Sequence, residues 1–448
     1  MSEVIVNRFQ SLAIRRFAVV FTGATPRRDD PANWDGGTIP WINSGAVNQR
    51  RIVRHSSLIT KRGFQSSSTK WIPAGSVVIA MAGQGKTKGM AATVERPMTG
   101  NQSLAALIVN RRIMDYRYLA FALEPEYRNL RGVVGNEERS GLSLQDIRSF
   151  KIPVPSLEEQ GLIVRYLDHA ELRIAKTIVA KQRMIALLDE REELVLLEAI
   201  SQSDQPMTTD SRLDWLGEFP AHWAVKRLGS LLEERNEMNA DRQIQQVLSL
   251  VRKRGVMRYE DKGRIGNKRS DDVARYKVVR EGDIVLNSMN VIIGSVGQSS
   301  YTGCLSPVYY VLKPRSNELH NSYFNALFQV ERFHSSLVRF GKGILAHRLR
   351  IPMIDLKTVM LPVPPPDEQL AIADRVVKAT AELKAAKAGI EAEIALLREY
   401  RTRLISDVVT GKLDVRDEAA TLLEIDPMEL ATAAVGENGD DEEATDDD

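Results

Sequence analysis

One pattern occurs twice in the chain, and its spacing limits the possible fold more than any other feature. Residues 152–160 read IPVPSLEEQ and residues 361–369 read LPVPPPDEQ, so the copies lie 209 residues apart. The prolines keep preceding residues out of the α conformation. The acidic residues that follow suit the positive end of a helix dipole. Each copy therefore predicts a strand end leading into a helix, and the chain is interpreted as a tandem duplication.

Both copies open a long helical stretch with an apolar heptad column. Residues 157–200 contain no proline, and no glycine after Gly161. In residues 366–410 the single glycine is Gly389, and Gly411 follows where a helix C-cap is expected. A column of this period predicts that the two helices pack along a seam, and about 44 residues make a rod of roughly 65 Å. Because each helix follows its own head in a tandem duplication, we expect an antiparallel two-helix coiled coil. Lys181 interrupts the column in the first copy. The predicted seam consists of Leu167, Ile174, Leu188 and Val195 in the first helix and Val376, Leu383, Ile390, Leu397 and Leu404 in the second.

A globular head precedes each helix. Residues 72–79 (IPAGSVVI) align with residues 278–285 (VVREGDIV), and each segment predicts a turn followed by a buried strand. Helical stretches are expected at 116–123 and 322–335. The fold class is therefore α+β, with two mixed heads and a coiled coil in a pseudo-two-fold repeat.

The repeat also sets the expected domains. The boundaries are residues 1–155 for the first head, 156–204 for the central helix, 205–364 for the second head, 365–415 for the C-terminal helix and 416–448 for an acidic, disordered tail.

Composition limits the compartment and the partners. The single cysteine, Cys304, excludes a disulfide framework and suits a reducing compartment. Without a signal-like start or a membrane-length apolar run, we expect a cytoplasmic protein with no membrane partner. Residues 437–448 hold eight carboxylates, and without them the net charge of +2 becomes +10. A net charge of +10 favours binding to a polyanion such as nucleic acid. The alternative is that this is ordinary surface charge, which keeps many proteins in solution.

No catalytic or metal-binding constellation is expected. Residues 80–87 (AMAGQGKT) fit a loosened phosphate-loop pattern, but Gly89 and a returning strand follow where a helix is required. A hairpin tip, with Lys86 and Lys88 free to meet phosphate, is the preferred interpretation. The six histidines lack metal-ligand spacing, and Cys304 is expected to be a buried apolar residue. An Asn-Pro-Pro-Tyr/Phe motif for adenine methylation is absent. The sequence therefore predicts a binding protein.

Basic residues beside glycines and polar residues are the candidates for DNA contact, with a solvated charged surface as the alternative. In the first head they are Arg50, Arg51, Arg54, Lys61, Arg62, Lys70, Lys86 and Lys88. In the second head they are Arg252, Lys253, Arg254, Arg258, Lys262, Arg264, Lys268 and Arg269, with Lys342, His347, Arg348 and Arg350 before the last helix.

Four further segments point to one family. They are residues 22–26 (TGATP), 34–42 (WDGGTIPWI), 142–147 (LSLQDI) and 215–223 (WLGEFPAHW). Together with the repeated proline motif, they resemble the specificity (S) subunits of Type I restriction–modification systems over about residues 8–415. The second head departs from the family pattern, because residues 243–251 occupy the place of the second Gly-Gly-x-Ile-Pro-Trp segment.

The resemblance implies a division of labour. Each head is a target-recognition domain that reads half of a bipartite double-stranded DNA sequence, and the helices set the spacing. Two modification subunits add S-adenosylmethionine-dependent adenine methylation, and restriction subunits add ATP- and magnesium-dependent translocation and cleavage. The chain itself would bind no cofactor and catalyse nothing. Three alternatives stay open: the specificity subunit of a modification-only system, a phosphate-loop ATPase, and a coiled-coil scaffold whose heads bind protein.

Overall fold

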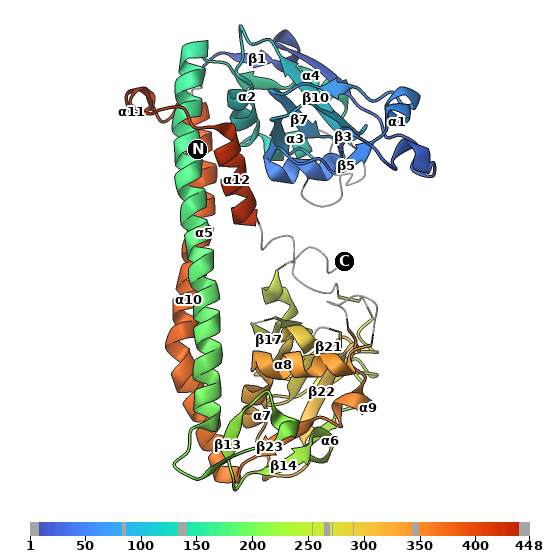
Figure 1. The fold of residues 1–448 in the computed structure, drawn as a ribbon, viewed down its shortest axis with the longest axis vertical. Coiled ribbons are helices and arrows are strands. Elements are labelled where there is room, and N and C mark those ends of the chain that lie inside the picture. The colour runs from blue at the N-terminus through green and yellow to red at the C-terminus, as the bar shows by residue number, and fades with distance from the viewer. Residues whose placement is uncertain are drawn as a thin grey trace. The chain divides into compact units, whose positions relative to one another are not determined.

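The computed structural model places each head in a compact unit with the neighbouring parts of both long helices (Figure 1). The described residues are 9–82, 87–132, 141–252, 254–263, 269–270, 272–289, 291–342 and 349–438. Within them, the first unit comprises residues up to Gln182 and from Glu391 onward, and the second comprises Arg183–Ile390.

A five-stranded sheet forms the centre of the first head, and both its faces are covered. Val77 and Ile79 of β7 belong to the apolar cluster shared with the long helices, whereas Val78 belongs to a second cluster on the opposite face. Because side chains alternate along a strand, a sheet covered on both faces needs continuous apolar runs. The strand order is β2 (Ala18–Thr22), β10 (Leu104–Val109), β7 (Ser76–Ala80), β8 (Ala91–Val94) and β4 (Arg51–Ile52).

Smaller elements complete the first head. A four-stranded sheet has the order β5 (Ser57–Ile59), β3 (Ile39–Ile42), β9 (Met98–Gly100) and β6 (Trp71–Ile72). A short pair joins β1 (Ser11–Ala13) to β11 (Lys151–Pro153). The helices are α1 (Lys61–Ser66), α2 (Tyr116–Leu123), α3 (Tyr127–Gly132) and α4 (Leu144–Ser149), with a 3-10 helix η3 (Ser44–Gln49) before β4.

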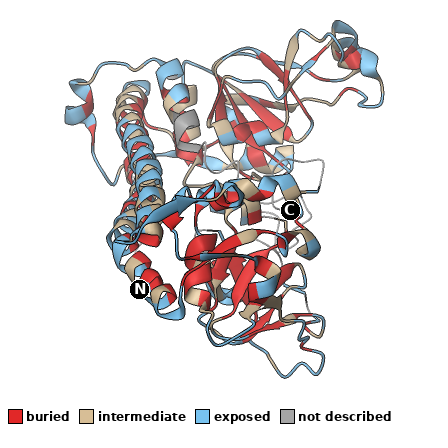
Figure 2. Ribbon diagram, turned by 60° about the horizontal axis from the view of Figure 1, so that its bottom comes forward, coloured by how far each residue is buried: buried red, intermediate tan, exposed pale blue. Residues whose placement is uncertain are grey.

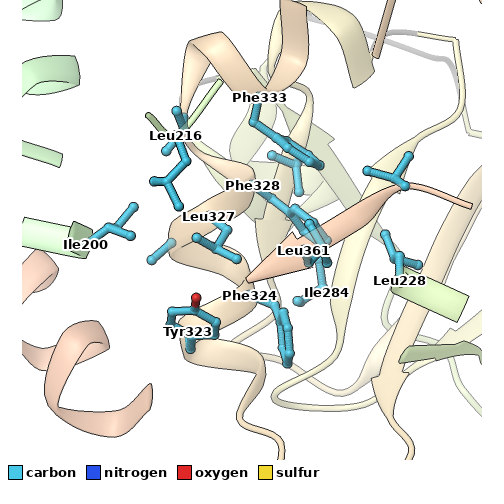
Figure 3. Packing of buried hydrophobic residues seen from close by; sticks show 14 of the residues in the cluster. Ile200, Leu216, Leu228, Ile284, Tyr323, Phe324, Leu327, Phe328, Phe333 and Leu361 are labelled. Atoms are coloured by element: carbon cyan, nitrogen blue, oxygen red, sulfur yellow. The ribbon is translucent and has the colours of Figure 1, made fainter. Parts of the chain in front are cut away.

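The second head repeats this layering on a four-stranded sheet. Its order is β15 (Leu232–Glu234), β22 (Tyr309–Pro314), β19 (Ile284–Asn287) and β20 (Val296–Gln298). Ile284 and Leu286 face the cluster shared with the long helices, and Val285 faces the other. Figure 3 shows Ile284 among Phe324, Phe328 and other members of the first cluster. Figure 2 shows buried residues along the strands of both heads.

Four strand pairs and four short helices surround this sheet. The pairs are β12 (Met207–Thr209) with β13 (Glu218–Pro220), β14 (Ala224–Arg227) with β23 (Met360–Val363), β16 (Leu248–Val251) with β17 (Gly255–Arg258), and β18 (Lys277–Val279) with β21 (Gly303–Leu305). The helices are α6 (Leu228–Leu231), α7 (Asn321–Phe328), α8 (Glu331–Leu337) and α9 (Met353–Leu356). Cys304 in β21 is buried, as predicted.

The predicted alignment of the two central strands is wrong by one residue. Leu107 of β10 pairs with Val77, and its counterpart Leu312 of β22 pairs with Ile284, so Val77 corresponds to Ile284. Two glycines with positive φ, Gly75 (76°) and Gly282 (88°), begin the corresponding turns. The shift matters because one residue of slip sends each side chain to the opposite face.

One of the two short helical stretches expected in the heads is confirmed, and the other is divided into two helices. The stretch 116–123 is confirmed as α2, but 322–335 is divided into α7 and α8. The side-chain carboxylate of Glu193, on the long helix of the same unit, accepts hydrogen bonds from the backbone N–H groups of Glu331 (2.9 Å) and Arg332 (3.2 Å). This cap satisfies N–H groups at a new helix start, and residue spacing alone does not reveal it.

The long helices α5 (Leu157–Ser201) and α10 (Pro366–Val409) confirm the coiled coil. In the second unit, Lys387 binds Asp189 (2.7 Å) and Arg375 binds the carbonyl oxygen of Gln202 (2.8 Å), so the helices run antiparallel. All nine predicted seam residues are buried or half-buried. Lys181, the interruption, pairs with Glu393 across the helices of the first unit.

The expectation of a disordered tail is wrong for residues 416–438, and residues 439–448 lie outside the described residues. The chain forms α11 (Arg416–Ala420) and α12 (Pro427–Asn438) in the first unit. Ala419, Leu430 and Ala431 are buried. Leu430 and Ala431 give this segment an apolar face, which a composition dominated by the terminal carboxylates obscures.

Candidate nucleic-acid interface

Two loops meet in each head at corresponding places. In the first head, the backbone N–H of Leu142 donates to the carbonyl oxygen of Met81 (2.9 Å), which directly follows β7. In the second, Ile351 donates to Ser288 (3.0 Å), which directly follows β19. The loop that leaves the central strand is thereby held to the segment that precedes α4 or α9. Three of the predicted DNA contacts, Lys86, His347 and Arg348, lie outside the described residues.

The exposed basic candidates of the first head lie on or next to short elements. Arg54 follows β4, Lys61 and Arg62 begin α1, and Lys70 precedes β6. Figure 1 shows α1 at the side of this head that faces away from the long helices. Arg62 binds Asp30 (3.0 Å), but its side chain remains 67% exposed and can still reach a phosphate. Lys88, in the β7–β8 connection, is half-buried.

The sequence did not single out an exposed aromatic residue in this region. Trp71 in β6 is 45% exposed, and its ring lies 5.9 Å from that of Phe64 in α1. An exposed aromatic ring beside cations can stack on a base while the cations contact phosphates. Its signal in the sequence is the adjacent Lys70, although a single Lys-Trp pair is common.

The structure contradicts two DNA-contact predictions in the first head. Arg51 is buried, and its Nη2 donates to Asp168 of α5 (2.5 Å). Arg50 binds Glu124 of α2 (2.5 Å) and Glu171 of α5 (3.0 Å). Both guanidiniums therefore join β4 to the helices of this unit. The sequence could not show this, because their carboxylate partners are 74 to 121 residues away.

The charge cluster changes the titration of its members. Burial opposes the charged form of Arg51, but the carboxylates of Asp168 and Glu171 outweigh it and raise its pKa. Burial also raises the pKa of Asp168 to about 6, against the lowering effect of Arg51.

In the second head, three candidates are exposed on the β16–β17 hairpin. Arg252 and Arg254 lie in its turn, and Arg258 ends β17 with its guanidinium 5.4 Å from the Tyr301 ring. Arg269 is also exposed, and its backbone N–H donates to the Tyr259 hydroxyl (2.9 Å). Lys253, Arg264 and Lys268 lie outside the described residues.

The prediction that Lys262 contacts DNA is wrong. Its side chain is buried, its ammonium lies 4.4 Å from the centre of the Tyr259 ring, and burial lowers its pKa. The aromatic ring attracts the cation and leaves little of it accessible.

The last basic pair, Lys342 and Arg350, is joined through the backbone. Lys342 and Arg350 exchange two backbone hydrogen bonds (2.9 and 3.1 Å), and both residues are exposed. Lys342 also binds Asp355 (3.0 Å).

The glycine-rich segment after β7 does not continue as a phosphate-loop helix. The backbone N–H of Gly89 donates to Ala80 (2.8 Å), and that of Ala80 donates to Met90 (3.0 Å), before β8 begins at Ala91. Residues 83–86 lie outside the described residues, but 87–90 form a turn between antiparallel strands. The phosphate-loop alternative therefore lacks the helix that its chemistry requires.

Two buried glutamines make matching hydrogen bonds in the two copies of the repeat. The side chain of Gln160 donates to Ile113 (2.9 Å) and Pro155 (2.9 Å) and accepts from the backbone of Asp115 (2.8 Å). Gln369 makes the same three contacts, to Glu318 (3.3 Å), Pro364 (3.0 Å) and His320 (2.9 Å). Each ties a helix start to the loop before α2 or α7. In the sequence, the repeated Glu-Gln pair indicated the duplication, but it did not reveal that the glutamine ties the helix start to this loop.

The described residues offer neither a metal site nor a membrane-spanning helix. They contain no cluster of three histidine, cysteine or carboxylate side chains that could hold a metal ion. None of their helices has the length and apolar character needed to cross a membrane.

Comparison with known proteins agrees with this geometry. Residues 10–181 match the family model described as a type I restriction modification DNA specificity domain. The chain is 30% identical over 151 residues to the EcoR124I/EcoR124II specificity subunit of Escherichia coli, covering 33% of the chain and 37% of that protein. It is 24% identical over 231 residues to the MjaIX specificity subunit of Methanocaldococcus jannaschii, covering 51% of the chain and 52% of that protein.

These matches cover about a third to a half of the curated relatives, but the fold agrees over a longer span. A solved chain from work on complex assembly and conformational transition of the type I R-M system matches 90% of this chain and 98% of its own length. Its TM-score is 0.56 at 17% identity, which supports the fold. Residues 10–181 therefore match the type I restriction modification DNA specificity domain, and the resemblance of the chain to Type I specificity subunits is confirmed.

Proposed function

We propose that this chain is the DNA-reading subunit of a Type I restriction–modification complex and that each head reads one half of a bipartite target. The observation that carries the proposal is the paired loop arrangement, with Met81 bonded to Leu142 and Ser288 to Ile351. The same backbone arrangement thus occurs in two heads whose exposed basic side chains differ. Contacts with the phosphates of DNA position a protein, whereas side-chain contacts with base edges supply sequence specificity.

The partners form part of the proposal. Two modification subunits would supply S-adenosylmethionine chemistry on adenine, and restriction subunits would supply ATP- and magnesium-dependent translocation and cleavage. The chain would contribute recognition and no catalysis, and it would work in the cytoplasm. The family match over residues 10–181 and the likeness to named specificity subunits support this assignment.

The recognition test compares basic residues of each head. The complex is reconstituted with its modification subunits, and DNA affinity is measured against salt concentration for Arg54→Ala/Lys70→Ala and for Arg252→Ala/Arg254→Ala. Each lost phosphate contact should reduce the slope of log K against log salt by about 1. Lys378→Ala/Arg403→Ala is the matched control, because both side chains are exposed on α10. Equal slopes in all three variants would refute the assignment of these surfaces.

The spacing test changes both long helices together. One heptad is inserted after Gln182 and another after Ile390, near the Lys181–Glu393 pair. Seven helical residues add about 10 Å, or about three base pairs. Mapping adenine methylation should show unchanged half-sites with a longer spacer. An insertion in α10 alone should instead prevent assembly, because the seam loses its partner. Altered half-sites in the double insertion would contradict the division between heads and helices.

A further inference from the structure

The C-terminal segment, residues 416–438, is attached to one face of α5 in the first unit. It lies beyond the part of the chain that resembles the specificity subunits. Three polar contacts join it to the helix: Arg165 to the carbonyl oxygen of Ala419 (3.4 Å), His169 Nε2 to that of Leu423 (2.8 Å), and Lys176 to the carboxylate of Glu429 (3.1 Å). The three helix residues are four and seven positions apart, so they share one face, and the segment follows α5 for about three turns.

The helix α12 also contacts the first head. Leu430 and Ala431 are 4% and 2% exposed, and α12 lies beside β4 and η3 of the head (Figure 1). Both side chains of the Lys176–Glu429 pair are more than half exposed, so this pair contributes little. Burial of the apolar side chains therefore holds α12 in place, between α5 and the head.

The connection between η3 and β4 has a second, direct attachment to α5. Arg50 binds Glu171 of α5 (3.0 Å). Arg51 binds Asp168 of the same helix (2.5 Å). This part of the head is therefore held to α5 in two ways, by its own ion pairs and through α12. A body that is held at one place can still pivot about it, whereas a second attachment also restricts rotation.

The same connection carries one of the proposed DNA contacts, Arg54. The side chain of Gln49, the last residue of η3, donates to the carbonyl oxygen of Arg54 (3.0 Å). It also accepts from the backbone N–H groups of Val53 (3.3 Å) and Arg54 (3.0 Å). Because Gln49 ties Arg54 to η3, and η3 lies against α12, the position of the head on α5 decides where the exposed Arg54 meets DNA.

We propose that residues 416–438 form a brace that positions the first head on α5 and so restricts the spacer that the complex accepts between the two half-sites. The inference rests on the proposed function, because it concerns how strictly a bipartite target is measured. One added base pair moves a half-site by about 3.4 Å and turns it by about 35°. A braced head cannot follow this displacement, whereas a head without the brace can pivot toward it.

A pair of adjacent substitutions tests the brace in the full chain with its modification subunits. Ala431→Glu puts a carboxylate into the buried contact and should release α12 from the head. Thr432→Glu, the matched control, adds the same charge at an exposed position. Adenine methylation is measured on duplexes with unchanged half-sites and a spacer that is native, one base pair shorter or one longer. The preference for the native spacer should fall about tenfold in Ala431→Glu, which corresponds to about 1.4 kcal/mol, and should not change in the control.

Hydrogen exchange of residues 44–54, measured on the chain without DNA, separates the brace from the proposed function. Exchange should be faster in Ala431→Glu than in Thr432→Glu. A chain that ends at Ile425 lacks α12 and should behave like Ala431→Glu, whereas one that ends at Asn438 should behave like the wild type. Faster exchange with an unchanged spacer preference, or unchanged exchange, would overturn the brace. A wild-type complex that methylated no bipartite target would instead refute the proposed function, and exchange would still decide whether α12 holds the head.

Discussion

The two heads share a frame and differ in what is built on it. In both, a buried glutamine ties the helix start to a preceding loop, and a buried tyrosine donates to a proline carbonyl: Tyr118 to Pro153 (3.0 Å) and Tyr323 to Pro362 (3.1 Å). The first head adds a second sheet and carries α12. The second head adds the basic β16–β17 hairpin. The difference teaches that the duplicated part is the attachment of a head to its helix, whereas the exposed surface varies.

Removing the glutamines should break the shared frame with the largest effect. Gln160→Ala and Gln369→Ala each leave one donor and two carbonyl groups without their partner. Unmade buried hydrogen bonds cost about 1–3 kcal/mol per group, so each variant should lose about 3–4 kcal/mol. Hydrogen exchange in β10 and β22 would report the two units separately. We expect each variant to weaken its own unit and to leave the other unchanged.

The control for this pair is Gln145→Ala, because Gln145 is exposed on α4 and bonds Ser149 at 3.3 Å. It should change stability by no more than about 0.5 kcal/mol. If Gln160→Ala destabilised the chain and Gln369→Ala did not, the two attachments would be unequal despite their matching bonds.

The C-terminal segment is a difference between the units, and Leu430→Ala tests it. Leu430 is 4% exposed on α12, which lies beside β4 and η3 of the first head. Truncating a buried leucine typically costs about 2–3 kcal/mol or more. Protection of β4 from hydrogen exchange should fall, and β22 should be unaffected. Leu423, at 82% exposure in the same segment, provides the matched control, Leu423→Ala, with no expected effect.

Sequence reasoning reached what depends on local pattern and periodicity. The heptad columns and the repeated proline motif predicted both long helices and their antiparallel pairing. Sequence reasoning failed where burial decides. Arg51 and Lys262 are basic residues in polar stretches, but Arg51 is buried against Asp168, which is 117 residues away, and Lys262 is buried beside the Tyr259 ring. Trp71 escaped notice because exposure depends on the whole sheet.

Acidity should distinguish the units, because Asp168 has its pKa raised to about 6 by burial in the first. A carboxyl whose pKa is raised by folding binds more protons in the folded state, so its contribution to stability falls as pH rises from about 4 to 6. The shift corresponds to about 2–3 kcal/mol. Asp168→Asn should remove this slope when unfolding is measured by denaturant between pH 4 and 7. An unchanged slope would show that the buried pair with Arg51 does not titrate in this range.

The smallest contrast lies between two lysines on the long helices. Lys181 occupies a seam position of the first unit, and its partner Glu393 is 59% exposed, so the pair contributes only about 0–1 kcal/mol. Lys181→Leu should therefore stabilise the first unit by about 0.5 kcal/mol, because it completes the apolar column.

Lys387, in the second unit, binds both Asp189 and Glu192, and these carboxylates outweigh burial and raise its pKa. Lys387→Leu should destabilise by about 1 kcal/mol, because two half-buried carboxylates lose their cation. Thermal unfolding at low and at 1 M salt would measure both effects, and the loss at Lys387 should shrink with screening. Two effects of the same sign would mean that the helix pair tolerates charge equally along its length.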